Sequence, residues 1–433
     1  MKKIARAVLQ NPLLKANMVM VGGAFVGHFG AYLYHLIVGR MLPPSEYGIL
    51  QSLISLSNLI TVPLVMLNTM MVKFVSQFAG RGELGKVAYL YNRLSRGFWW
   101  TLAVGGVSFF LFYQPVLQFL HISSVGSFVF LDIALFFGLL QMLNRSVIQG
   151  LSRFVELVVS NIMESYGKLL FGVLAVTVGW GATGAFGAFV LAGALTYLYT
   201  TVVLRSTAKH TEVHAAIGWR RLGKESVASL IMTISMIALF NIDVVLVRHF
   251  FSGVESGLYA ALSVLGKIIY FGSSPVANTM LPMVSEAHVK GTGFHRMFLT
   301  SLFLTILFAG GVTALYALFP RQSLTILIGS QYAAAAPYLP YFSLFLSLCA
   351  LINIVTMFYF STHQFVPIFF MPVAAVAQAV LIWLYHETLL TVVTVSLGVT
   401  ASLLGMLLLY YAYALYSETS LRHRARIPAG KVH

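Results

Sequence analysis

Lys168 and Lys267 lie inside long apolar segments of the sequence, where an ammonium group could bind an anion. Lys168 follows Glu164 at the i, i+4 spacing, which places both side chains on one face of a helix. A charged side chain at the centre of a membrane-spanning helix costs about 2.5–3.5 kcal/mol, so it must face protein or water. Either the charges of Glu164 and Lys168 neutralise each other, which lets the helix insert into the membrane, or Lys168 faces an anionic ligand.

Lys267 is the sharper candidate, because no acidic residue lies within one helical turn of it. It belongs to a polar stripe at helical spacing, formed by Ser263, Lys267, Tyr270, Ser274 and Asn278. An earlier segment carries a similar stripe, formed by Gln51, Ser55, Asn58 and Thr69. Such stripes can make interhelical hydrogen bonds worth about 0.6 kcal/mol each. A lysine in a water-filled cavity, by contrast, is a docking point for phosphate, and this is the interpretation we favour.

Asp243 is an acidic residue inside another apolar segment. It either pairs with Lys267 across a helical hairpin or couples transport to a gradient of Na⁺ or H⁺. The sequence has no Asp-x-Asp pair and no Gly-x-x-x-x-Gly-Lys-Ser/Thr phosphate loop. We therefore expect neither an enzyme nor a cofactor, and no metal site.

Composition indicates how these residues must be positioned. The chain has 433 residues, of which 59% are hydrophobic and 9% charged, and its mean hydropathy is +0.86. Soluble domains carry roughly 25% charged residues, so most of this surface must face lipid. Because a span needs about 20 apolar residues, the length predicts about twelve transmembrane helices. The expected fold class is an all-α polytopic membrane protein.

Basic residues give the chain a formal charge of +15, and their distribution predicts its orientation. Most of them fall in the N-terminal segment, in alternate connectors and in the C-terminal tail. The other connectors hold only Arg40, Arg248 and Arg321. This asymmetry predicts that both termini are cytoplasmic, and it accounts for the charge without nucleic acid as a partner.

A short connector recurs about half the chain length later. Val38–Gly48 and Val247–Gly257 each have a basic residue closing one apolar segment and a Glu-x-Gly opening the next. The repeat predicts two six-helix lobes related by a pseudo-two-fold axis along the membrane normal, a recurring transporter plan. The predicted parts are a cytoplasmic amphipathic segment 1–16, an N-lobe 17–204, a basic cytoplasmic linker 205–225, a C-lobe 226–415 and a basic cytoplasmic tail 416–433.

The first connector also carries a family resemblance. Gly39, Arg40, Leu42, Pro44, Tyr47 and Gly48, together with the segments Ile148 to Phe154 and Asn241 to Val247, resemble polysaccharide-export flippases. These belong to the multidrug/oligosaccharidyl-lipid/polysaccharide (MOP) flippase superfamily. The resemblance implies a twelve-helix, two-lobed fold in the bacterial cytoplasmic membrane. It also implies outward translocation of a polyprenyl-pyrophosphate-linked oligosaccharide, with membrane lipids and polysaccharide polymerase machinery as partners.

For the site, the resemblance implies a cationic central cavity that binds the pyrophosphate. Lys267 and Lys168 would lie in the cavity. By their position between two apolar segments, Arg145, Arg153 and Glu156 cluster at the cytoplasmic mouth. Anchoring to lipid head groups is the favoured explanation for this cluster, and recruitment of the pyrophosphate is the alternative. Polar residues of the stripes would contact the sugars; they include Tyr270, Asn278 and Asn58. The alternatives are an ion-coupled multidrug extruder of the same superfamily, with Asp243 as the coupling acid, and a scaffold without transport.

Overall fold

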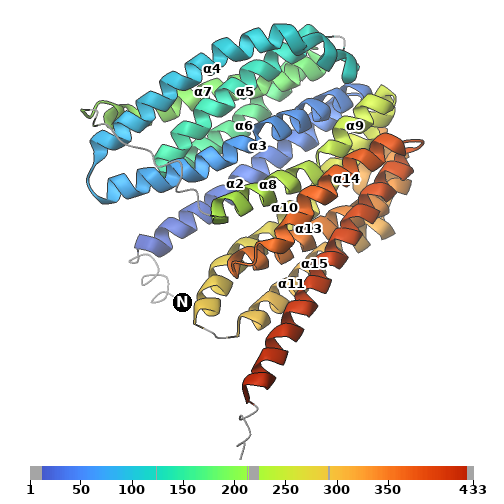
Figure 1. Cartoon of the computed structure of the whole chain (residues 1–433). Helices are drawn as coiled ribbons and strands as arrows, with labels where there is room; N and C mark the ends of the chain where they lie inside the picture. Colours follow the sequence, from blue (N-terminus) through green and yellow to red (C-terminus); the bar gives the residue numbers. More distant parts are fainter. Residues whose placement is uncertain (1–11, 123, 212, 214–223, 291–292, 427–433) are drawn as a thin grey trace, which may run out of the picture. The chain divides into compact units, whose positions relative to one another are not determined.

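The computed structural model describes residues 12–122, 124–211, 213, 224–290 and 293–426. Regular structure in this part of the chain is helical throughout (Figure 1). Helices satisfy every backbone hydrogen bond within the segment, as a chain in lipid requires. Among the described residues, nine helices are long and apolar enough to cross a membrane, and ten if a bent pair in α3 counts as one span. The chain is therefore a multi-pass membrane protein.

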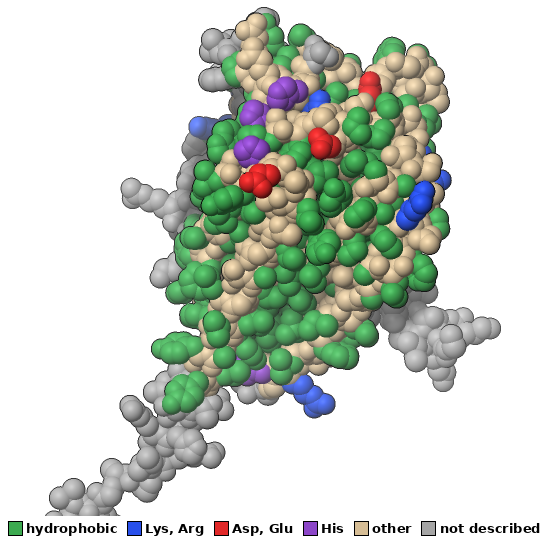
Figure 2. All heavy atoms as spheres, turned by 90° about the vertical axis from the view of Figure 1, so that its right-hand side faces the viewer, with side chains coloured by type: hydrophobic (Ala, Val, Ile, Leu, Met, Phe, Trp, Pro, Cys, Tyr) green, Lys and Arg blue, Asp and Glu red, His purple; other side chains and the backbone are tan. Residues whose placement is uncertain are grey.

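The sequence predicted about twelve spans, and the described residues confirm nine or ten of them. The predicted first and third spans fall on α2 (Pro12–Met41) and α4 (Leu84–Phe119), which are helical but outside the set of nine or ten. Large apolar side chains are exposed along the described helices, including Trp100 (75%) and Leu409 (72%). Figure 2 shows a face on which hydrophobic side chains predominate and charged side chains are few. Such a surface suits lipid rather than water.

The chain forms two compact units. Unit 1 comprises Met1–Leu222, Val244–Ala261 and Arg321–Ala335, and unit 2 comprises Gly223–Asp243, Leu262–Pro320 and Ala336–His433. Two segments from the second half of the sequence thus belong to unit 1 with the first half. The lobe boundaries predicted from the repeat stay a prediction.

Unit 1 contains the first six long helices. They are α2, α3 (Pro44–Gly80), α4, α5 (Val125–Gly150), α6 (Phe154–Thr177) and α7 (Gly181–Ala208). Helix α6 packs against α2 and α7, and α5 packs against α3 and α7. Glycines allow close approach, as where Gly23 of α2 meets Val158 of α6 and Gly150 of α5 meets Val75 of α3.

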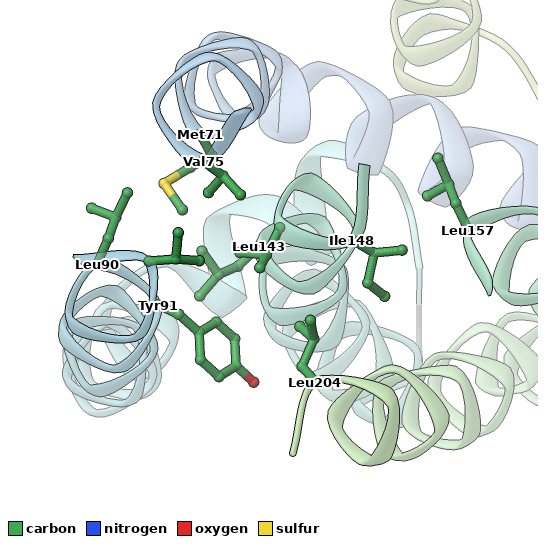
Figure 3. Close-up of a cluster of buried hydrophobic side chains, with 10 residues drawn as sticks. Met71, Val75, Leu90, Tyr91, Leu143, Ile148, Leu157 and Leu204 are labelled. Carbon is green, nitrogen blue, oxygen red and sulfur yellow. The ribbon is translucent and has the colours of Figure 1, made fainter. Parts of the chain in front are cut away.

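A buried apolar cluster joins five helices of unit 1 (Figure 3). It contains Met71 and Val75 of α3, Val87, Leu90 and Tyr91 of α4, Leu143, Val147 and Ile148 of α5, Leu157 of α6 and Leu204 of α7. Leu143 and Val147 flank Arg145 in the sequence and are 1% and 0% exposed. Their burial sets the rotation of α5 about its axis and hence the direction in which Arg145 can point.

Unit 2 contains α8 (Lys224–Leu239), most of α10 (Gly253–Val289), α11 (Phe294–Leu318), α13 (Leu339–Ser361), α14 (Phe370–Leu384) and α15 (Leu389–Arg426). Helix α13 packs against α11 and α15, and α14 packs against α8 and α15. Unit 2 also contains the 3₁₀ helix η3 (Val366–Phe369). Three other short elements lie mostly in unit 1: α9 (Ile242–Phe250), α12 (Pro320–Leu327) and the 3₁₀ helix η2 (Ser330–Tyr338). Helices α8 and α9 are separated by a break at Phe240 and Asn241.

Candidate anion-binding site

Two neighbouring helices of unit 1 bring Arg145, Glu164 and Lys168 together. Arg145 lies near the C-terminal end of α5, and the other two residues lie one turn apart near the middle of α6. Both helices are among the candidate membrane spans. We refer to these three side chains as the α5–α6 cluster.

Glu164 is the centre of the α5–α6 cluster, because its two carboxylate oxygens bind different cations. Oε2 lies 2.6 Å from Nη1 of Arg145. Oε1 accepts a hydrogen bond from Nζ of Lys168, the i, i+4 partner predicted from the sequence. Charge-assisted hydrogen bonds of this kind are about twice as strong as those between neutral groups.

Each cation also has a partner other than Glu164. Arg145 donates from Nε to Oγ of Ser160 at 3.1 Å and from Nη2 to the Ser160 carbonyl at 2.9 Å. Nζ of Lys168 lies 4.5 Å from the ring centroid of Phe189 in α7, within cation–π range. These contacts hold the two cations in place independently of the carboxylate.

The α5–α6 cluster carries one net positive charge, because two cations share one carboxylate. The side chains of Arg145, Glu164 and Lys168 are 18%, 20% and 22% exposed, so they are partly buried and still reachable. A net charge in a low-dielectric layer is costly unless a counter-ion approaches it. The net charge of this cluster suits an anion with several acceptor oxygens, such as a phosphate.

Arg153 has different partners from Arg145. Its guanidinium lies 2.9 Å from Oε1 of Glu156, three residues later, and Nη1 donates to the Val203 carbonyl of α7 at 2.9 Å. The second contact ties the start of α6 to α7. The two arginines that the sequence placed together at the cytoplasmic mouth thus occupy two separate networks.

Lys267 lies in unit 2, beside the break between α8 and α9. Its ammonium donates to Oδ1 of Asn241 at 3.2 Å and lies 5.7 Å from the ring centroid of Phe240. The Tyr270 ring packs on the same phenylalanine, with centroids 4.9 Å apart. Asp243 is fully buried and within electrostatic range of Lys267. Lys267 is therefore held by Asn241 of the preceding span, and its pairing with Asp243 stays a prediction.

The other residues predicted for the site show less organisation. Asn58 of α3 and Asn278 of α10 are exposed, whereas Ser263 in the same stripe as Asn278 is buried. Among the described residues, no three or more His, Cys, Asp or Glu side chains are arranged to hold a metal ion.

Sequence reasoning missed two features of the candidate sites. It treated Glu164 only as the partner of Lys168, because Arg145 comes from another helix and the pairing has no signal in local spacing. It also did not single out Asn241, which holds Lys267. The signal for Asn241 was its position, two residues before Asp243 within the segment that resembles the flippases.

The architecture resembles that of MOP superfamily transporters of known structure. An inward-facing multidrug resistance MATE family transporter of the MOP superfamily matches with a TM-score of 0.72 at 14% identity, covering 91% of this chain and 96% of that one. The lipid II flippase MurJ in an inward closed conformation matches with a TM-score of 0.71 at 12% identity, covering 91% and 87%. A MOP superfamily transporter from Pyrococcus furiosus matches with a TM-score of 0.54 at 14% identity, covering 96% and 98%.

These likenesses show the fold. The chain is an all-helical membrane protein with the fold of MOP superfamily transporters, as the resemblance implied. No protein-family model matches the chain, and no curated protein matches its sequence.

Proposed function

We propose that this protein is a flippase that moves a polyprenyl-pyrophosphate-linked oligosaccharide from the cytoplasmic to the outer leaflet. The observation that carries the proposal is the α5–α6 cluster, in which Arg145 and Lys168 share a single carboxylate inside candidate membrane spans. A net positive site suits a pyrophosphate, and it disfavours the cations that many drug extruders carry. The fold supports the transport step, because proteins of this fold include a lipid II flippase.

In this proposal the pyrophosphate binds Arg145 and Lys168 of unit 1. The role predicted for Lys267 from the sequence is tested separately. Polar residues such as Tyr270, Asn58 and Asn278 contact the sugars, while the polyprenyl chain stays in lipid. Alternating access of the two predicted lobes then opens the site outward. The protein would reside in a bacterial cytoplasmic membrane with both termini inside, and it would supply the machinery that polymerises the polysaccharide.

The test is a strain that lacks the gene. We expect an oligosaccharide linked to the polyprenyl carrier to accumulate on the cytoplasmic leaflet. The wild-type gene and the Lys290→Gln variant should reverse the accumulation, since Lys290 forms an exposed pair with Glu286. Lys168→Glu should not reverse it, although the protein is made and inserted. A deletion strain with no accumulation, or full rescue by Lys168→Glu, would contradict the proposal.

A second candidate function rests on Asp243. This fully buried acid lies in a candidate span, and the fold is also that of a multidrug MATE family transporter. An ion-coupled drug extruder would use Asp243 as the coupling acid. In that case the deletion strain would accumulate no lipid-linked sugar and would become sensitive to cationic drugs, and Asp243→Asn would fail to restore resistance.

A further inference from the structure

The carboxylate of Glu164 is arranged as a phosphate group would be. One oxygen binds the guanidinium of Arg145 and the other binds the ammonium of Lys168. A phosphate oxygen pair has the same charge sign and the same acceptor chemistry. We infer that Glu164 is a built-in competitor for the diphosphate of the substrate, and that the diphosphate binds by displacing the Glu164 carboxylate from both cations. This inference rests on the proposed function.

The surrounding contacts allow such an exchange. Arg145 keeps its two hydrogen bonds to Ser160 when the carboxylate leaves, and Lys168 keeps the face of Phe189. Both cations therefore stay near their positions and need no new support. Glu164 itself is one-fifth exposed, so its side chain has room to turn away from both cations without opening the helix pair.

An internal competitor solves a problem specific to transport. Two unshared cations in a low-dielectric site would bind a diphosphate tightly and release it slowly, whereas a transporter must release its substrate. The returning carboxylate of Glu164 neutralises part of the positive charge as the substrate leaves. Glu164 therefore sets the affinity for the diphosphate, and it is a specificity-determining residue rather than only a structural ion-pair partner.

The experiment measures equilibrium binding to the purified full chain in detergent. The probes are inorganic pyrophosphate and farnesyl pyrophosphate, so that the contribution of the phosphates is separated from that of a lipid chain. Glu164→Gln removes the competing charge and keeps the side-chain shape. We expect it to bind both probes about tenfold more tightly than wild type, because one negative charge beside the two cations is lost.

The matched control is Glu286→Gln. Glu286 pairs with Lys290 at the same i, i+4 spacing, but the two side chains are 68% and 64% exposed. Its replacement should leave the affinity for both probes unchanged. Glu164→Asp serves as a second variant in case Glu164→Gln does not fold, because it keeps the charge and is too short to bridge both cations. We expect Glu164→Asp to bind more tightly than wild type and less tightly than Glu164→Gln.

The failures of the inference and of the proposed function differ. If the wild-type protein binds the probes and neither Glu164→Gln nor Glu164→Asp binds them more tightly, the competitor role is wrong, although the anion site remains. If no variant binds either probe, or if Arg145→Gln binds as well as wild type, the cluster is not a diphosphate site. The proposed function would then lose the observation that carries it.

Discussion

Gly48 and Gly257 hold corresponding positions in the two repeated connectors, and in unit 1 they pack directly against each other. A Cβ atom added to Gly48 would lie 2.9 Å from the backbone nitrogen of Gly257. One added to Gly257 would overlap the carbonyl group of Pro44. Each copy of the connector thus carries a glycine at the same position. These two glycines let the start of α3 contact the start of α10.

Replacing Gly257 by Ala should destabilise unit 1. The new methyl group has no space beside Pro44, and overpacking of this kind costs about 1–3 kcal/mol. The check is a thermal melt of the purified protein in detergent, where a clear drop in melting temperature is expected. Gly398→Ala is the control, since a Cβ there meets nothing within 4 Å. Equal melting temperatures for the two variants would show that the contact is not tight.

Arg248 of α9 should be a structural anchor. It is 5% exposed and donates to the carbonyl oxygens of Leu120 and His121 at 2.8 and 2.9 Å, and to Oγ of Ser256 at 3.0 Å. Arg248→Ala leaves these acceptors without their charged donor, which should lower stability by about 3 kcal/mol. Protein yield and thermal melting measure this loss. Arg321→Ala, at an exposed position, should have no such effect.

Arg153 should contribute to packing and not to anion binding. Its contacts are Glu156 and the Val203 carbonyl, away from the α5–α6 cluster. Arg153→Gln should therefore lower the melting temperature slightly and leave pyrophosphate affinity unchanged, whereas Arg145→Gln should abolish that affinity. The two pyrophosphate affinities are read from the same binding titration, and the melting temperature from a thermal melt. A loss of affinity in Arg153→Gln as large as that in Arg145→Gln would place both arginines in one site.

Lys267 should contribute its charge to export. Lys267→Arg keeps the charge and should retain part of the activity, while Lys267→Glu should abolish export at normal protein levels. Asn241→Ala removes the hydrogen-bond acceptor of the ammonium and should have an intermediate effect. Accumulation of the polyprenyl-linked oligosaccharide in the deletion strain measures all three. Normal export by Lys267→Glu would contradict the role predicted for Lys267 from the sequence.

Composition and periodicity were enough to predict the class of protein. Few charged residues and many apolar segments require a helical membrane protein, and the structure confirms it. The connector that begins at Val38, together with the segments Ile148 to Phe154 and Asn241 to Val247, correctly indicated a MOP-like fold. The flippase subfamily and the full set of twelve spans stay predictions.

Pairing within one helix was predictable, and pairing between helices was not. The Glu164–Lys168 contact follows from i, i+4 spacing, which fixes two side chains on one face whatever surrounds them. The contact of Arg145 with Glu164 depends on how α5 is rotated against α6, and burial of Leu143 and Val147 sets that rotation.

The same reason explains the remaining differences. Arg145 and Arg153 are close in sequence, but one lies on α5 and the other precedes α6, so packing directs them to Ser160 and Val203 respectively. Asn241 reaches Lys267 only because two spans lie side by side in unit 2. Local spacing encodes which residues share a helix face, whereas contacts between helices are decided by the packing of all their apolar side chains together.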